Sequence, residues 1–122
     1  MDISEERFHE LIDRAFDSLP KVHRDRVKNV ALVTAEEPTA EQRRELKLHC
    51  SETLLGLYSG VPLTERQGRE PLMPDVITLF KQPLLMHSEN ETELYENIRH
   101  TLWHEVAHYY GLNHDQIHKL EK

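Results

Sequence analysis

Three histidines and a glutamate near the end of the chain have a spacing that suits metal chemistry. From His104 to His114 the sequence reads H-E-V-A-H-Y-Y-G-L-N-H. Residues four apart lie one turn apart on the same face of a helix, so the imidazoles of His104 and His108 can bind one zinc ion at roughly 2.0–2.1 Å. Glu105 projects about 100° further around the helix, where it misses the metal but can reach water bound to it. The pattern predicts a zinc site with Glu105 as the catalytic base.

A third metal ligand has to come from beyond this helix. A side chain eight residues after His104 would lie about 12 Å from it, too far to share one metal ion. Gly111 can adopt the left-handed conformation that ends a helix, so that the chain turns and His114 returns to the metal. We therefore expect one zinc ion held by His104, His108 and His114, with a fourth position left for water. The composition gives the full pattern by chance in about 2 of 10,000 such chains.

The other histidines and Asp115 are weaker candidates for a functional role. His100 lies one turn before His104, and its position is more typical of a residue that packs or orients a ligand than of a ligand. Asp115 and His118 could orient or replace His114, although an exposed helix end also accounts for them. The remaining histidines have no partner in the sequence and are predicted to lie on the surface; they are His9, His23, His49 and His87.

The first half of the chain predicts helices and strands that could support this site. Apolar residues recur at helical spacing over Ser4–Leu19, with Ser4 as the N-cap and Pro20 just after the end. The segment Asn29–Thr34 is rich in β-branched residues and predicts a strand. Thr39–Cys50 predicts a short surface helix. Leu54–Val61 contains two glycines, which favour an edge strand that another backbone approaches closely.

The second half predicts a further strand and the helix that carries the motif. Pro62–Pro74 has the charges, glycine and prolines of a loop, and Val76–Phe80 predicts a strand that Leu84–Met86 resumes. A capping pattern at Asn90–Glu93 begins a helix that runs through Tyr110 and ends at Gly111. Its apolar residues lie on more than one face, which predicts a deeply buried helix. A short final helix is expected around Ile117 and Leu120.

Composition limits the classes of protein that fit. A chain of 122 residues suits a single domain over residues 1–122. The formal charge of -7 disfavours contact with phosphate backbones and anionic lipids, so we expect neither a nucleic-acid nor a membrane partner. The first residues lack the pattern of a signal peptide, and no segment reaches membrane-spanning length. Cys50 is the only cysteine, which excludes an internal disulfide and agrees with the cytoplasmic location that we expect.

The motif also resembles the zinc-binding sequence of a known class of enzymes, the zincin metallopeptidases. Its glycine and third histidine resemble the metzincin version, but no methionine follows His114 to form the Met-turn of metzincins. The chain is more similar to small bacterial zinc metallopeptidase-like proteins, the mini-zincins, through Leu54–Arg66, Pro74–Phe80 and His104–His114, about half of the chain. In that family the third ligand is often acidic, so His114 is a departure. The resemblance implies an α+β minimal domain, with about three strands in a small mixed sheet packed against helices and a central active-site helix.

The function that these residues favour is zinc-dependent hydrolysis of a peptide or protein substrate, with Glu105 moving the protons. A non-catalytic module that binds metal or a partner, including a second copy in a homodimer, remains an alternative. RNA hydrolysis fits the histidine spacing less well, because Glu105 and the negative charge both oppose it. Candidates to stabilise the oxyanion are Tyr58, Arg66, Tyr109 and Tyr110. The strand Leu54–Val61 is a candidate to align an extended peptide.

Overall fold

A small mixed sheet forms one layer of the molecule. The computed structural model describes residues 2–26, 30–49, 55–60 and 75–110. Its strands are β1 (Ala31–Ala35), β2 (Gly56–Ser59) and β3 (Val76–Phe80), in the order β1-β3-β2. β3 is parallel to β1 and antiparallel to β2. All three predicted strands are therefore confirmed within a residue or two of their expected limits, and β2 lies at an edge of the described sheet, as its glycines predict.

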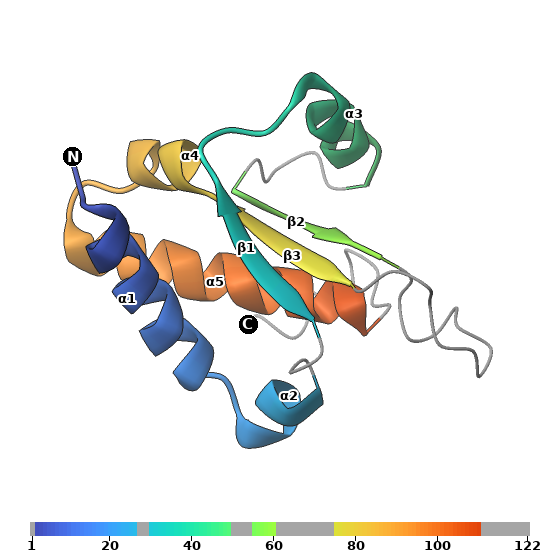
Figure 1. Cartoon of the computed structure of the whole chain (residues 1–122), viewed down its shortest axis with the longest axis horizontal. Coiled ribbons are helices and arrows are strands. Elements are labelled where there is room, and N and C mark those ends of the chain that lie inside the picture. Colours follow the sequence, from blue (N-terminus) through green and yellow to red (C-terminus); the bar gives the residue numbers. More distant parts are fainter. Residues whose placement is uncertain (1, 27–29, 50–54, 61–74, 111–122) are drawn as a thin grey trace.

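The long helix α5 (Glu91–Tyr109) packs against one face of this sheet, behind it in the view of Figure 1. Asn90 caps the helix, since its side chain accepts a hydrogen bond from the backbone N–H of Glu93 at 2.9 Å. Nine of its 19 residues are buried, from Leu94 to Tyr109. The expectation of a deeply buried helix is confirmed, because α5 touches the sheet on one side and α1 on another. Gly111, its predicted stop, lies outside the described residues.

The first helix, α1 (Glu5–Asp17), packs against α5 and crosses in front of its first part in Figure 1. Ser4 caps it as predicted, with its side chain accepting from the backbone N–H of Arg7 at 3.1 Å. The buried face carries Phe8, Leu11, Ile12 and Ala15, which join residues of α5 and β3 in one hydrophobic cluster. Burial of these side chains stabilises the packing of the N-terminal segment on α5.

The prediction that Leu84–Met86 resumes a strand is wrong. The segment forms a short helix, α4 (Lys81–Met86), directly after β3. Pro83 lies in its first turn, where a missing backbone N–H costs no helical hydrogen bond. Leu84 and Leu85 are buried in the main core, so the apolar run fits a helix end as well as a strand.

Two further helices lie between α1 and β2 in the chain. α3 (Ala40–His49) confirms the predicted surface helix, and α2 (Lys21–Arg26) is a turn of helix that the sequence pattern does not reveal. The predicted loop 62–74 and the final helix around residues 117–120 lie outside the described residues. Among the described residues the protein thus has a three-stranded mixed sheet and five helices, which confirms the α+β class.

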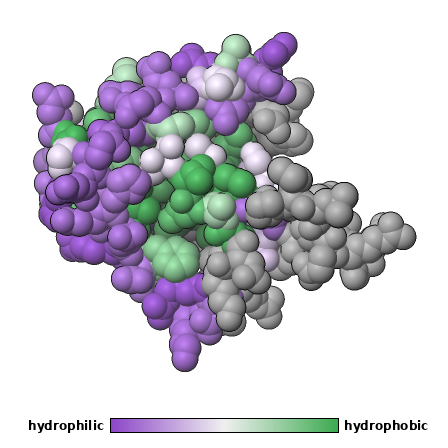
Figure 2. Space-filling model, in the orientation of Figure 1, coloured by the Kyte–Doolittle hydropathy of each residue, from purple (hydrophilic) through white to green (hydrophobic). Residues whose placement is uncertain are grey.

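The face of the sheet that points away from α5 is apolar. Leu57 and Phe80 form a small buried cluster there with Ala35 packed against it. Figure 2 shows hydrophobic surface over β1, where Val33 keeps 42% of its surface exposed. No helix in the described parts of the chain is long and apolar enough to span a membrane.

Candidate metal centre

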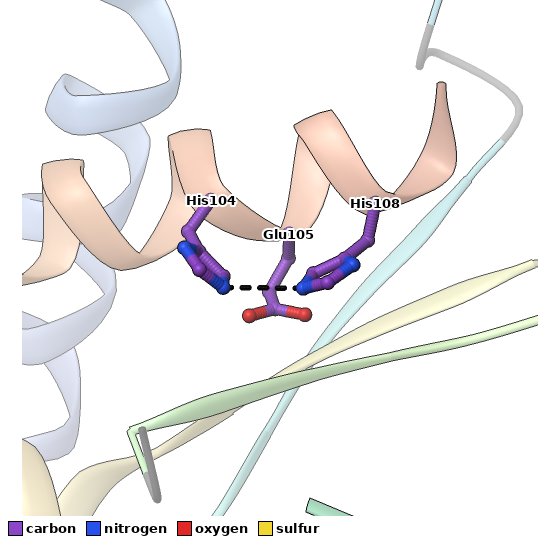
Figure 3. A group of neighbouring side chains, drawn as sticks. All are labelled: His104, Glu105 and His108. Carbon is purple, nitrogen blue, oxygen red and sulfur yellow. Dashed lines mark hydrogen bonds between the residues drawn. The ribbon is translucent and has the colours of Figure 1, made fainter. Parts of the chain in front are cut away.

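His104 and His108 lie side by side on α5 and turn the same nitrogen toward each other. Their Nε2 atoms are 3.1 Å apart, and their ring centroids are 4.8 Å apart with the planes inclined by 70°. Figure 3 shows both rings projecting from successive turns of the helix toward a common point. Helical spacing alone produces this arrangement, as the four-residue separation predicts.

The separation of these nitrogens fits two ligands of one zinc ion. With Zn–N bonds of roughly 2.0–2.1 Å and a tetrahedral angle, the two nitrogens should lie about 3.3 Å apart. The observed 3.1 Å needs only a small opening of the pair. His104 is buried, with 4% of its surface exposed, and His108 is partly buried. Two neutral imidazoles held this way have the donor set that zinc prefers.

Glu105 completes the group from the next position along the helix. His104, Glu105 and His108 each offer one ligand atom, and these three atoms lie within 4.8 Å of one another. In Figure 3 the carboxylate projects between the two imidazoles toward the sheet. The carboxylate is therefore close enough to act on a metal held by the imidazoles or on water bound to it.

Burial changes the acidity of this carboxylate. Only 3% of Glu105 is exposed, and burial raises its pKa to about 8, partly offset by a hydrogen bond from the backbone N–H of Tyr58. A divalent ion nearby favours the charged form and moves the pKa downward. Burial and a bound cation would therefore shift the pKa of Glu105 in opposite directions.

The Tyr58 N–H belongs to the outer edge of β2. Phe80 donates its backbone N–H to the carbonyl of Leu55 at 2.9 Å, which makes Leu55 and Phe80 a hydrogen-bonded pair of the antiparallel ladder. Such pairs alternate, so Leu57 bonds to β3 whereas Gly56 and Tyr58 direct their backbone N–H and C=O groups away from it. The hydrogen bond between Tyr58 and Glu105 therefore links the edge of the sheet to the histidine pair.

A close approach of helix and strand makes this link possible. A Cβ atom added at Gly56 would lie 2.6 Å from Cγ2 of Thr101, one helical turn before Glu105. With any larger residue at this position, either the Thr101 side chain or α5 itself would have to move. Glycine at position 56 is therefore required by the distance between the two elements, as the prediction of a closely approached edge strand implies.

The predicted site residues fall into two groups. His104, Glu105 and His108 come together as the spacing predicts. His114 lies outside the described residues, as do Asp115, His118 and Arg66, so the third ligand stays a prediction. His100 is exposed and is not a member of the group formed by the other three.

The prediction of a surface position is right for two histidines and wrong for a third. His9 and His87 are exposed. His23, on α2, is partly buried: its Nδ1 lies 2.8 Å from the hydroxyl oxygen of Tyr110, and its ring centroid lies 5.0 Å from that of Trp103. Because Tyr110 is 87 residues further along the chain, no local pattern indicates this contact. The side chain of His49 is not among those described.

The structure describes all three tyrosines that are candidates for oxyanion stabilisation. Tyr110 is engaged with His23, and the Tyr109 ring packs edge-on against the Tyr58 ring with centroids 5.9 Å apart. The Tyr58 hydroxyl is buried, and it lies 2.9 Å from where a Cβ on Gly60 would be. The part of Tyr58 that reaches the site is its backbone N–H, which residue type alone does not indicate.

Comparison with known proteins agrees with this geometry. Residues 27–122 match the family model of the zincin-like metallopeptidases. The match covers more than half of the chain and includes the sheet, α5 and the whole histidine motif. The chain therefore belongs to the zincin-like metallopeptidase family. No curated protein is similar enough to the chain to count as a match.

Proposed function

We propose that this protein is a zinc-dependent peptidase in which His104, His108 and His114 hold the metal and Glu105 is the catalytic base. The observation that carries the proposal is the convergence of two imidazole nitrogens with a buried carboxylate at 4.8 Å or less. Membership of the zincin-like family supports the reaction class. Three histidine ligands leave one coordination position for water, as in catalytic rather than structural zinc sites.

Each described residue of the centre has a distinct role in this proposal. Bound zinc supplies a Lewis acid that polarises the peptide carbonyl and makes water a better nucleophile. Glu105 takes a proton from the attacking water and passes it to the leaving amine, since its carboxylate lies within 4.8 Å of the histidine ligand atoms. Burial of Glu105 keeps bulk water from competing for that proton.

The substrate that we propose is an extended peptide lying along the outer edge of β2. No other described strand pairs with this edge, and the Gly56 backbone groups point outward there. Added as a further strand, a peptide would form main-chain hydrogen bonds that depend little on its sequence. This placement would bring its backbone beside Glu105, which already contacts the same edge.

The test is cleavage of a diverse peptide library by the zinc-loaded protein, with Glu105→Gln as the matched control. The glutamine has nearly the same shape but cannot accept the proton, so we expect cleavage to fall by a factor of about 100 to 10,000 while zinc remains bound. His114→Ala should lower zinc affinity. Equal cleavage by both proteins would refute the catalytic role of Glu105.

A silent library with zinc demonstrably bound would favour the alternative, a zincin-like module that binds metal or a protein partner without catalysis. The exposed apolar residue Val33 on the sheet face opposite α5 is compatible with such a partner, including a second copy of this chain. Sedimentation of the zinc-loaded protein would then show whether it forms a dimer.

A further inference from the structure

The catalytic glutamate of the proposed reaction is held from two directions. Its own helix fixes the backbone of Glu105 between the two metal-binding histidines. From the other side, the backbone N–H of Tyr58 donates a hydrogen bond to its carboxylate. The carboxylate can rotate about its side-chain bonds, so the second contact decides where its oxygens lie relative to the imidazole pair.

The ladder of the sheet leaves this N–H available for the carboxylate. Leu57 and Ser59 are the residues of β2 whose backbone groups bond to β3, as the hydrogen bond from Phe80 to Leu55 shows. Tyr58, between them, must find its partner on the outer side. The Glu105 carboxylate accepts this hydrogen bond. The Tyr58 N–H is therefore satisfied although no described strand pairs with this edge of β2.

The approach of Gly56 to Thr101 keeps this contact in range. Thr101 and Glu105 are one turn apart on α5, and Gly56 and Tyr58 are two residues apart on β2. Both pairs meet on the same face of the sheet, with no room at Gly56 for a Cβ atom. The strand thus lies against the helix over the stretch that carries the base.

We propose that the Tyr58 backbone amide is the positioning group for Glu105, setting the carboxylate beside the histidine pair. The inference deepens the proposed peptidase function and rests on it for its catalytic meaning. It also limits how a peptide can bind. A substrate strand on this edge can use the Gly56 N–H and C=O, but the Tyr58 N–H is already committed to Glu105.

The hydrogen bond itself can be tested without any substrate. Amide hydrogen exchange at Tyr58 should be about tenfold or more faster in Glu105→Ala than in the wild-type protein, each loaded with zinc. Glu105→Gln is the matched control, because its side-chain oxygen still accepts the bond and should preserve the protection. The amides of Leu57 and Ser59, which bond to β3, should exchange equally in all three proteins. Unchanged Tyr58 exchange in Glu105→Ala would overturn the inference.

The positioning role is tested by comparing Tyr58→Pro with Tyr58→Ala. Both variants lose the aromatic ring, but only proline lacks the backbone N–H, and an edge strand tolerates proline where the N–H points outward. We expect kcat about 10–100-fold lower in Tyr58→Pro than in Tyr58→Ala, with KM and zinc content equal in the two.

The outcomes separate this inference from the proposed function. Equal kcat in the two Tyr58 variants, with an active wild-type protein, would refute the positioning role alone. A wild-type protein that binds zinc but cleaves no peptide would refute the proposed function and, with it, the positioning role. If Tyr58→Pro does not fold, the exchange measurement on the Glu105 variants decides whether the amide holds the carboxylate.

Discussion

Replacing Glu105 by glutamine should stabilise the metal-free protein as the pH rises. The pKa of this carboxyl group is raised from its ordinary value of 4.5 to about 8, chiefly by burial. A carboxyl group whose pKa is higher in the folded than in the unfolded state binds more protons when folded. Its contribution to the free energy of unfolding is therefore most favourable below pH 4.5 and is lost progressively as the pH rises toward 8.

The size of the effect follows from the two pKa values. At about 1.4 kcal/mol for each pKa unit, the difference between 4.5 and about 8 corresponds to at most about 5 kcal/mol. Between about pH 5 and pH 8, the wild-type protein should lose about 1.4 kcal/mol of stability per pH unit relative to Glu105→Gln. Glutamine is neutral throughout and can still accept the hydrogen bond from Tyr58, so the comparison isolates the charge.

The assay is urea denaturation of both proteins after chelation of metal, at several pH values from 5 to 8. The two stabilities should be nearly equal at pH 5 and diverge steadily above it, with the glutamine variant the more stable. His104, His108 and the rest of the chain are the same in both proteins, so the comparison reports on the side chain at position 105 and its immediate contacts. Parallel stability curves for the two proteins would show that burial does not hold Glu105 in its neutral form.

Further predictions concern the metal, the packing and one long-range contact. Zinc at 100 times its dissociation constant should stabilise the wild-type protein by about 2.7 kcal/mol in thermal unfolding, and His108→Ala should lose this gain. Gly56→Ala should lower the free energy of unfolding by about 1–3 kcal/mol, because its Cβ would lie 2.6 Å from Cγ2 of Thr101. The loss should be smaller in a Thr101→Ser background, which lacks that methyl group; an equal loss would point to another cause. Tyr110→Phe should cost about 1 kcal/mol in urea denaturation by removing the hydrogen bond to His23, and no change would show that water replaces it.

Local sequence patterns accounted for much of the fold and for the grouping of His104, Glu105 and His108. The His104–His108 pair depends only on helical spacing, and α5 begins at the predicted cap and carries the predicted buried faces. Hydrophobic and β-branched runs located all three strands. These features depend on residues within about one or two turns of each other, whose geometry is the same in any helix or strand.

Local patterns were insufficient where a segment had two acceptable conformations. Leu84–Met86 has the apolar character of a strand, but it forms the end of α4 because Leu84 and Leu85 reach the main core from a helix. His23 has no partner nearby in the chain, and its burial depends on Trp103 and Tyr110. In both cases a contact with a distant part of the chain selects between alternatives of similar local free energy.

The sequence by itself determined which side chains could bind a metal, because that information is contained in residue type and in the pitch of one helix. Only the tertiary structure decided what surrounds them. The pKa of Glu105 depends on burial by the rest of the fold, and the carboxylate is held by a backbone N–H on β2, a group that every residue except proline possesses. Whether such a group faces a neighbouring strand or the Glu105 carboxylate depends on sheet register and on how closely α5 approaches β2. Packing between distant segments of the chain sets both.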